Sequence, residues 1–137
     1  MNTTSAQETA RQILAGKVSF PEAVRSLLAA GVEYYHVDYA NLRKTLYGAD
    51  GSVLVTPLNF EGLPPVAPDF NVAALKAAIL DSQRNGQHFR EFSRRAMEAG
   101  VQSYFAFLRG QRVTYLGRQG DQHVEWFPGA APAPRNA

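Results

Sequence analysis

The chain contains no cysteine, which excludes disulfide bonds, thiolate metal ligands and cysteine nucleophiles. No apolar run approaches the roughly 20 residues of a membrane span, and the opening stretch MNTTSAQETARQ lacks the apolar core of a signal peptide. The sequence also lacks a G-x-S-x-G nucleophile elbow and a glycine loop of the kind that cradles phosphates. We therefore expect a cytoplasmic, soluble protein with no membrane span.

Length and composition predict one globular domain. The 137 residues are 45% hydrophobic and 19% charged, which is far from the composition of disordered chains. The net charge of +2 is unevenly distributed: residues 76–118 hold eight basic and three acidic side chains, whereas residues 1–75 hold five basic and seven acidic ones. This asymmetry suits either a polyanionic ligand or contact between opposite halves of two copies.

An internal repeat organises the chain. A gapless alignment at an offset of 69 residues places FPEAVRSLLAAGVEYYHVDYANLRKTLYGADG, beginning at Phe20, over FREFSRRAMEAGVQSYFAFLRGQRVTYLGRQG, beginning at Phe89. The copies share the tripeptide AGV, a tyrosine, an R-x-T pair and two glycines in one register. We interpret this as an internal duplication of one structural unit.

Each copy is predicted to form two helices followed by three strands. Ser5 with Glu8 and Ser19 with Glu22 have the spacing of capping boxes, and glycines follow each apolar stripe. The predicted helices run from Ser5 to Gly16, from Ser19 to Gly31, from Asn71 to Gly86 and from Phe89 to Gly100. The predicted strands are 32–39, 42–47, 53–56, 101–108, 112–117 and 122–127, with Ala40-Asn41 as the first turn.

These elements predict an α+β fold. The two copies, about 5–56 and 71–127, form antiparallel three-stranded meanders related by a pseudo-twofold axis and fused into one sheet with helices packed on a face. The connector 57–70 contains four prolines that forbid regular structure over much of its length. The tail 129–137 is expected to be mobile because it has little apolar surface.

The stretch YYHVDY, residues 34–39, carries the first candidate site. On a strand, Tyr34, His36 and Asp38 share one face and Tyr35 shares the other. Tyr35 aligns with Tyr104, which marks the core face of both copies. The opposite face holds histidine and carboxylate in one copy, whereas the other copy has Phe105 and Phe107, an apolar surface that calls for a covering partner, helix or ligand.

A second pair, His123 and Glu125, lies in GDQHVEWFPG near the end of the chain. If its strand lay beside the strand of His36 and Asp38, two imidazoles and two carboxylates could bind a divalent zinc, manganese or iron ion. Such a site could hydrolyse or oxidise a small substrate. The alternatives are hydrogen-bonded structural histidines and a metal-free pocket lined by the same side chains with Tyr34, Tyr35 and Tyr104.

The stretches YHVDY, TLY, YLG and GDQHVEWFP together resemble the YbcV-like bacterial family, a domain of unknown function numbered 1398 and labelled phage envelope protein. The resemblance covers roughly residues 10 to 128. It implies no established activity, and the phage label is a transferred name. The family pattern falls on Tyr35, His36, Asp38, Thr45, Tyr104, Gly117, Gly120, His123, Glu125, Phe127 and Pro128.

Three function classes remain open at this point. A non-catalytic module that binds a small molecule or protein, or that forms a homodimer, is preferred because the aromatic-rich strands need no special chemistry. A metal-dependent enzyme is the first alternative; otherwise no cofactor is expected. Nucleic-acid binding through Arg90, Arg94, Arg95 and nearby arginines is weaker, because Glu91 is spaced to pair with them along one helix.

Overall fold

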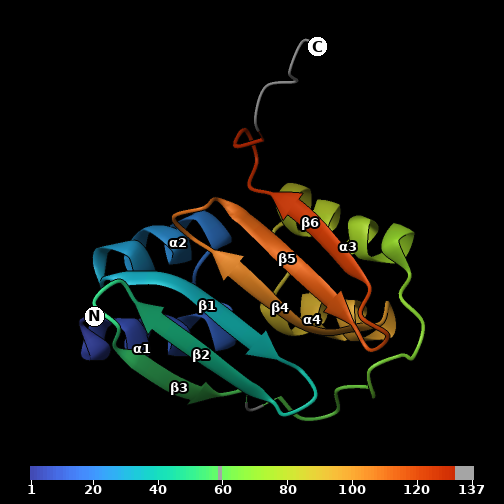
Figure 1. Ribbon diagram of the computed structural model, residues 1–137, viewed down its shortest axis with the longest axis horizontal. Coiled ribbons are helices and arrows are strands. Elements are labelled where there is room, and N and C mark those ends of the chain that lie inside the picture. Colours follow the sequence, from blue (N-terminus) through green and yellow to red (C-terminus); the bar gives the residue numbers. More distant parts are fainter. Residues whose placement is uncertain (59, 132–137) are drawn as a thin grey trace.

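A computed structural model describes residues 1–58 and 60–131. The elements are α1 (Thr3–Leu14), α2 (Phe20–Ala29), β1 (Val32–Asp38), β2 (Arg43–Gly48), β3 (Val53–Pro57), α3 (Val72–Asn85), α4 (Phe89–Glu98), β4 (Val101–Phe107), β5 (Arg112–Gly117) and β6 (Gln122–Trp126) (Figure 1). The predicted α+β class and the order of elements are confirmed. Within the described residues, no helix combines the length and apolar content needed to cross a bilayer. Most of the predicted tail, 132–137, lies outside the described residues.

All six strands form one antiparallel sheet in the order β3-β2-β1-β4-β5-β6. The halves meet at β1 and β4, where Tyr34 lies opposite Phe107, His36 opposite Phe105, and Asp38 opposite Ser103. At the repeat offset of 69 residues, Tyr34 corresponds to Ser103 and Asp38 to Phe107, so the first pair is equivalent to the third. His36 corresponds to Phe105, so the middle pair is equivalent to itself. The sheet is therefore nearly twofold symmetric about the pair His36 and Phe105.

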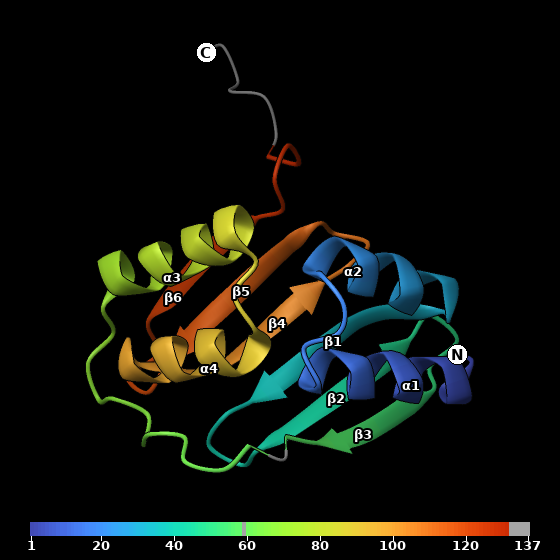
Figure 2. The ribbon, with the colours of Figure 1, turned by 180° about the vertical axis from the view of Figure 1, so that it is seen from behind.

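All four helices lie on one side of the sheet, as the view from behind shows (Figure 2). Helix α1 contacts β3, α2 contacts β1, and α4 contacts β4. The strands alternate accordingly: Tyr35, Val37, Leu46, Tyr104 and Tyr115 point toward the helices and are buried. The opposite side of the sheet carries no helix.

The helix starts agree with the predictions in two cases and differ in one. Ser19 accepts from the backbone N–H of Glu22 at 3.3 Å, and Asn71 accepts from that of Ala74 at 3.0 Å, so both predicted caps are confirmed. The predicted capping box at Ser5 is wrong, because Asn2 is the cap and Ser5 donates its N–H to the Asn2 side chain. Asn2 corresponds to Asn71 at the repeat offset, a match that the alignment from Phe20 did not reach.

The turn between β1 and β2 is longer than predicted. The strands stop at Asp38 and resume at Arg43, instead of leaving only Ala40-Asn41 between them. Leu42 adopts a φ of 53°, and Gln111, which occupies the same position in the second half, adopts 57°. A left-handed residue at the end of such a loop restores the register of a hairpin. Neither leucine nor glutamine favours this conformation, so the residue types did not reveal it.

Matching backbone features recur in the two halves. Gly31 and Gly100 both have positive φ after a helix, and the strand after each has an irregular register at its start. The agreement extends from element order to single dihedral angles. Descent of the two halves from one duplicated unit stays an interpretation of the sequence.

Candidate functional site: the open face of the sheet

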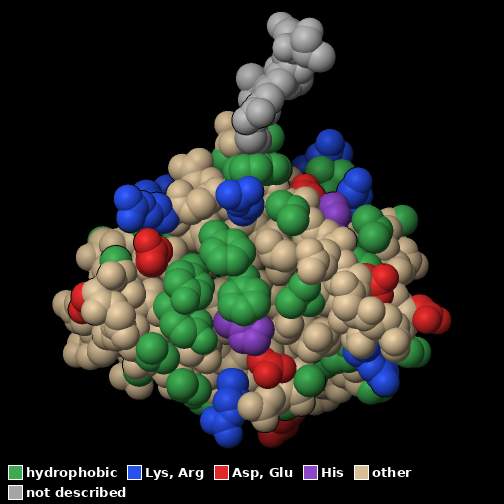
Figure 3. All heavy atoms as spheres, viewed as in Figure 1, with side chains coloured by type: hydrophobic (Ala, Val, Ile, Leu, Met, Phe, Trp, Pro, Cys, Tyr) green, Lys and Arg blue, Asp and Glu red, His purple; other side chains and the backbone are tan. Residues whose placement is uncertain are grey.

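The side of the sheet without helices is the candidate site, and we call it the open face. It is formed by alternate side chains of all six strands, as the cross-strand register requires. They are Tyr34, His36, Asp38, Arg43, Thr45, Tyr47, Val53, Val55, Pro57, Ser103, Phe105, Phe107, Arg112, Thr114, Leu116, Gln122, Val124 and Trp126. In Figure 3 hydrophobic side chains gather at the middle of this face, with a histidine at the edge of the patch.

The middle of the open face is a chain of stacked rings. Tyr34 stacks on Tyr47 with 4.5 Å between ring centres and lies 5.9 Å from Phe107. Phe107 stacks on Phe105 at 5.8 Å, and Phe105 stacks on His36 at 4.3 Å. Rings held by neighbouring rings lose little further conformational entropy on binding, which suits them to contact a partner.

The edges of the open face are also apolar. Val53 and Val55 on β3 are 56% and 51% exposed, and Val124 on β6 is 44% exposed. The formal charges lie at strand ends: Asp38 ends β1, Arg43 begins β2, and Arg112 begins β5. Arg112 lies over the ring of Trp126, 4.5 Å from its centre. The open face thus has an apolar middle and apolar edges along β3 and β6, and its charges lie at the strand ends.

His36 sits at the centre of the open face as a neutral group. Burial lowers the pKa of His36 below its ordinary value, and the nearby Asp38 opposes this shift only in part. Asp38 itself accepts the backbone N–H of Asn41 at 3.0 Å, which ties its carboxylate to the turn. The pair therefore acts in the structure as a neutral ring beside a turn-forming acid.

The second predicted pair lies elsewhere. His123 and Glu125 face the helices, because they pair in register with the buried residues Tyr115 and Val113. Their side chains contact each other, with 2.9 Å between Nε2 of His123 and Oε2 of Glu125. The imidazole also stacks on Tyr115 at 6.4 Å. The sequence had left open a structural histidine bonded to an acid of the neighbouring strand, whereas here the acid is Glu125 on the same strand.

The structure does not bring the four predicted metal ligands together. Strand β1 lies beside β4, not beside β6, so β4 and β5 separate the two pairs. The pairs also project from opposite faces. Accordingly, no group of three or more His, Asp and Glu side chains placed to hold a metal ion occurs within residues 1–58 and 60–131. Of the other predicted pocket residues, Tyr34 is on the open face, whereas Tyr35 and Tyr104 are in the core.

Sequence reasoning missed Lys44. Its side chain is 2% exposed on the helix-facing side of β2, with Nζ 4.4 Å from the ring centre of Tyr35 and 5.7 Å from that of Phe89. Burial lowers the pKa of Lys44 from 10.5 to about 7. The sequence repeat could have indicated that Lys44 is buried, because Lys44 aligns with the apolar Val113 and shares a strand face with the core residue Leu46.

The predicted basic helix face is largely paired within the protein. Arg94 contacts Glu91 and binds Glu98 at 2.7 Å, and Arg95 binds Asp81 at 2.8 Å. The predicted pairing of Glu91 with Arg94 is confirmed. Paired charges on α4 leave the helix side less suited to a polyanion than its composition indicates.

Comparison with known proteins adds no functional assignment. No family model matches the chain, and no curated protein matches it. The resemblance to the YbcV-like family therefore stays a proposal, and the geometry of the open face is the basis on which function can be argued.

Proposed function

We propose that this protein is a non-catalytic, self-associating module in which the open face packs against the open face of a second copy. The observation that carries the proposal is the stacked, uncharged middle of a six-stranded sheet that has no helix on that side. An antiparallel sheet tolerates one solvated face, but that face is then normally polar. Here partly buried aromatic rings occupy it.

The arrangement of polarity favours a protein partner. Specific interfaces have an apolar, aromatic centre and a polar rim, with charged residues depleted from the centre. The open face follows this pattern along the strand direction, with Asp38, Arg43 and Arg112 at strand ends and neutral rings between them, while its lateral edges on β3 and β6 are apolar. A polyanion would instead need cations along the middle. A second copy supplies the matching apolar surface through an isologous contact.

The size of the open face sets the expected affinity. Five gaps of about 4.8 Å between six strands and strand lengths near 20 Å give roughly 500 Å² of flat area. This area, which covers the whole face with its polar residues, is below the ~800 Å² per partner of a standard interface. We therefore expect a dimer that dissociates in the micromolar range. The YbcV-like resemblance places no constraint on this, because that family carries no established activity.

Phe105→Asp tests the proposal. Phe105 lies on the local symmetry axis of the sheet, so a carboxylate there would be desolvated at the centre of the contact. We expect sedimentation equilibrium to show a dissociation constant at least ~100-fold weaker than that of the wild type, the size of a central hot spot. Leu80→Asp is the control, because Leu80 is 43% exposed on α3, which lies on the helix side. A wild-type protein that stays monomeric at about 200 μM would contradict the proposal.

Acid is expected to dissociate the dimer through His36. Burial already disfavours the protonated ring, and a second copy would bury it further, so the dimer binds fewer protons than the monomer. Association is therefore strongest above the lowered pKa that His36 has in the monomer, and it weakens as the pH falls through that pKa. In His36→Phe the difference between dissociation constants at about pH 7.5 and pH 5 should shrink to less than twofold. Equal acid sensitivity of the two proteins would rule out this role for His36.

A further inference from the structure

A pocket of about 530 Å³ lies away from the open face, where the connector between the halves crosses one end of the sheet. Its walls come from the β1–β2 turn, the proline-rich connector, α4, the start of β4 and the residue after β5. Ligand pockets for small molecules span about 300–1,000 Å³. The volume therefore suits a compact organic molecule.

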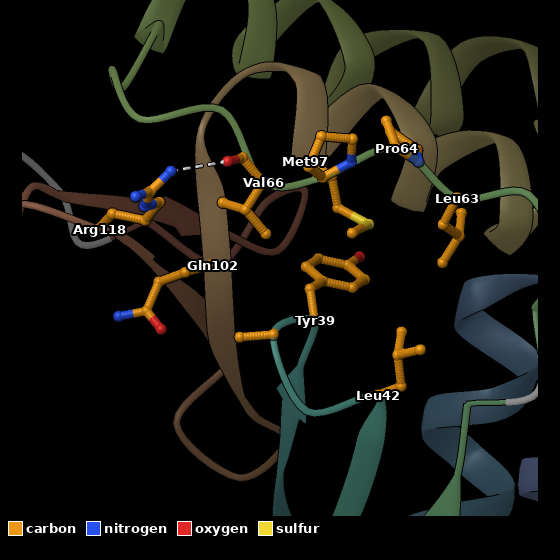
Figure 4. Close-up of a pocket in the computed structure, with 10 residues that line it drawn as sticks. Tyr39, Leu42, Leu63, Pro64, Val66, Met97, Gln102 and Arg118 are labelled. Carbon is orange, nitrogen blue, oxygen red and sulfur yellow. Dashed lines mark hydrogen bonds between the residues drawn. The ribbon is translucent and has the colours of Figure 1, made fainter.

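One side of the pocket is apolar. Leu42 from the turn and Leu63 from the connector lie on this side (Figure 4). The ring of Tyr39 and the thioether of Met97 lie in the middle of the pocket (Figure 4). The hydroxyl of Tyr39 donates to Ser93 at 3.0 Å, so the polar end of this ring already has a partner. An aliphatic chain could replace water here without leaving a polar group unpaired.

The other side of the pocket is cationic and hydrogen-bonding. Arg118 and Gln102 both lie on this side, with the guanidinium directed toward Val66 and the amide of Gln102 apart from it (Figure 4). A guanidinium Nη1 of Arg118 donates to the carbonyl of Val66 at 3.2 Å, which holds the side chain in place without neutralising its charge. None of the described residues that line the pocket is acidic. Nε2 of Gln102 donates to the carbonyl of Gly117 at 3.5 Å, which leaves its second N–H for a ligand. The pocket therefore offers one positive charge and one amide N–H beside an apolar surface.

These features belong to only one of the two halves. Arg118 aligns with Ala49 and Gln102 with Glu33, so the equivalent positions of the first half lack the cation and carry an acid. The connector that forms one wall also lies between the repeats and has no counterpart within them. The shared fold thus does not require these side chains, which leaves them free to serve a ligand.

We propose that this pocket binds a medium-chain aliphatic monocarboxylate. The carboxylate lies on the Arg118 guanidinium, with the Gln102 amide as a second donor, and the chain lies against Tyr39, Leu42, Leu63 and Met97. A planar guanidinium fork matches a carboxylate in a bidentate geometry. The chain binds by removing apolar surface from water.

The test is isothermal titration of the full chain with octanoate, beside 1-octanol, which has the same chain without the charge. Arg118→Gln should weaken octanoate at least about tenfold and change octanol binding less than twofold, because each charge-assisted hydrogen bond of the bidentate contact is worth about a factor of ten or more. Arg84→Gln is the matched control, since it removes the same charge from an exposed position on α3, and should leave both ligands unchanged.

A second variant tests the apolar side. Leu63→Asp introduces a charge on the connector, outside the helices and strands, and should abolish measurable binding of both ligands while far-ultraviolet circular dichroism stays unchanged. Octanoate binding that is insensitive to Arg118→Gln would overturn the proposal. So would the absence of saturable octanoate binding to the wild type below about 5 mM.

Discussion

Lys44→Met is expected to stabilise the protein on the order of 2 to 4 kcal/mol at pH 7, because the desolvation cost of the amine exceeds the gain from its cation–π contacts with Tyr35 and Phe89. The ammonium of Lys44 is 2% exposed among aromatic rings, and burial lowers its pKa from 10.5 to about 7. Folding at pH 7 must therefore either remove a proton from the amine or bury its charge, and each costs free energy. Methionine has a similar length and no charge to desolvate.

The pH dependence has a definite sign. Because the pKa of Lys44 is lower in the folded than in the unfolded chain, the unfolded state binds more protons between about pH 7 and 10.5. Wild-type stability should therefore rise with pH in this window, by up to about 1.4 kcal/mol per pH unit from this group. Below pH 7 the penalty is constant. Lys44→Met should remove the rise.

Buried tyrosines set the upper limit of the pH range in which the effect of Lys44 on stability can be measured. Burial raises the pKa of Tyr35, Tyr39, Tyr104 and Tyr115 above the ordinary value of 10, so stability falls as the pH rises past that value. Urea denaturation between about pH 7 and 9.5 therefore follows Lys44 below the range in which the tyrosines titrate, and the difference between the wild type and Lys44→Met gives its share. Lys76→Met, on the exposed side of α3, is the control and should stay within about 0.5 kcal/mol of the wild type. A variant less stable than the wild type at pH 7 would show that the buried amine stabilises the fold.

Gly100→Ala is expected to destabilise the protein by about 4 kcal/mol, which combines left-handed strain with overpacking. Gly100 has a φ of +93°, and a Cβ there would collide with the carbonyl of Asp69 and lie 2.9 Å from Cα of Phe70. Both obstacles are backbone, which cannot rotate away. The connector would have to move away from Gly100. This movement would break the hydrogen bond from the Asn71 N–H to the carbonyl of Ala99.

Gly120→Ala separates the two costs. Gly120 has a φ of +85°, but a Cβ there would meet no atom within 4 Å. We expect this variant to lose about 1 kcal/mol from backbone strain alone. Chemical denaturation of both variants gives the comparison. Equal losses at the two positions would mean that the connector gives way easily at Gly100.

The two halves could be delineated from sequence because local signals recur in them. Apolar periodicity, Asn71, Ser19 and the glycines after each helix report on local backbone geometry, and each acts within a few residues. These signals indicated the α+β class and the side of β1 that faces the core. Asn2 and Ser5 are both suitable residues for the N-cap of α1, and the sequence alone selected Ser5, which is the wrong one. The left-handed Leu42 was missed because leucine does not favour that conformation.

The sequence by itself determined which side chains share a face: His36 with Asp38, and His123 with Glu125, follow from the twofold alternation of a strand. Only the tertiary structure decided which strands are neighbours. Pairing of β1 with β4 joins residues about 70 positions apart, and many such pairings satisfy the same alternation. That choice separated the two histidine pairs, placed His36 against Phe105 and created the open face. It also buried Lys44. When β2 packs against the helices, every side chain on its helix-facing side is buried, whatever its charge.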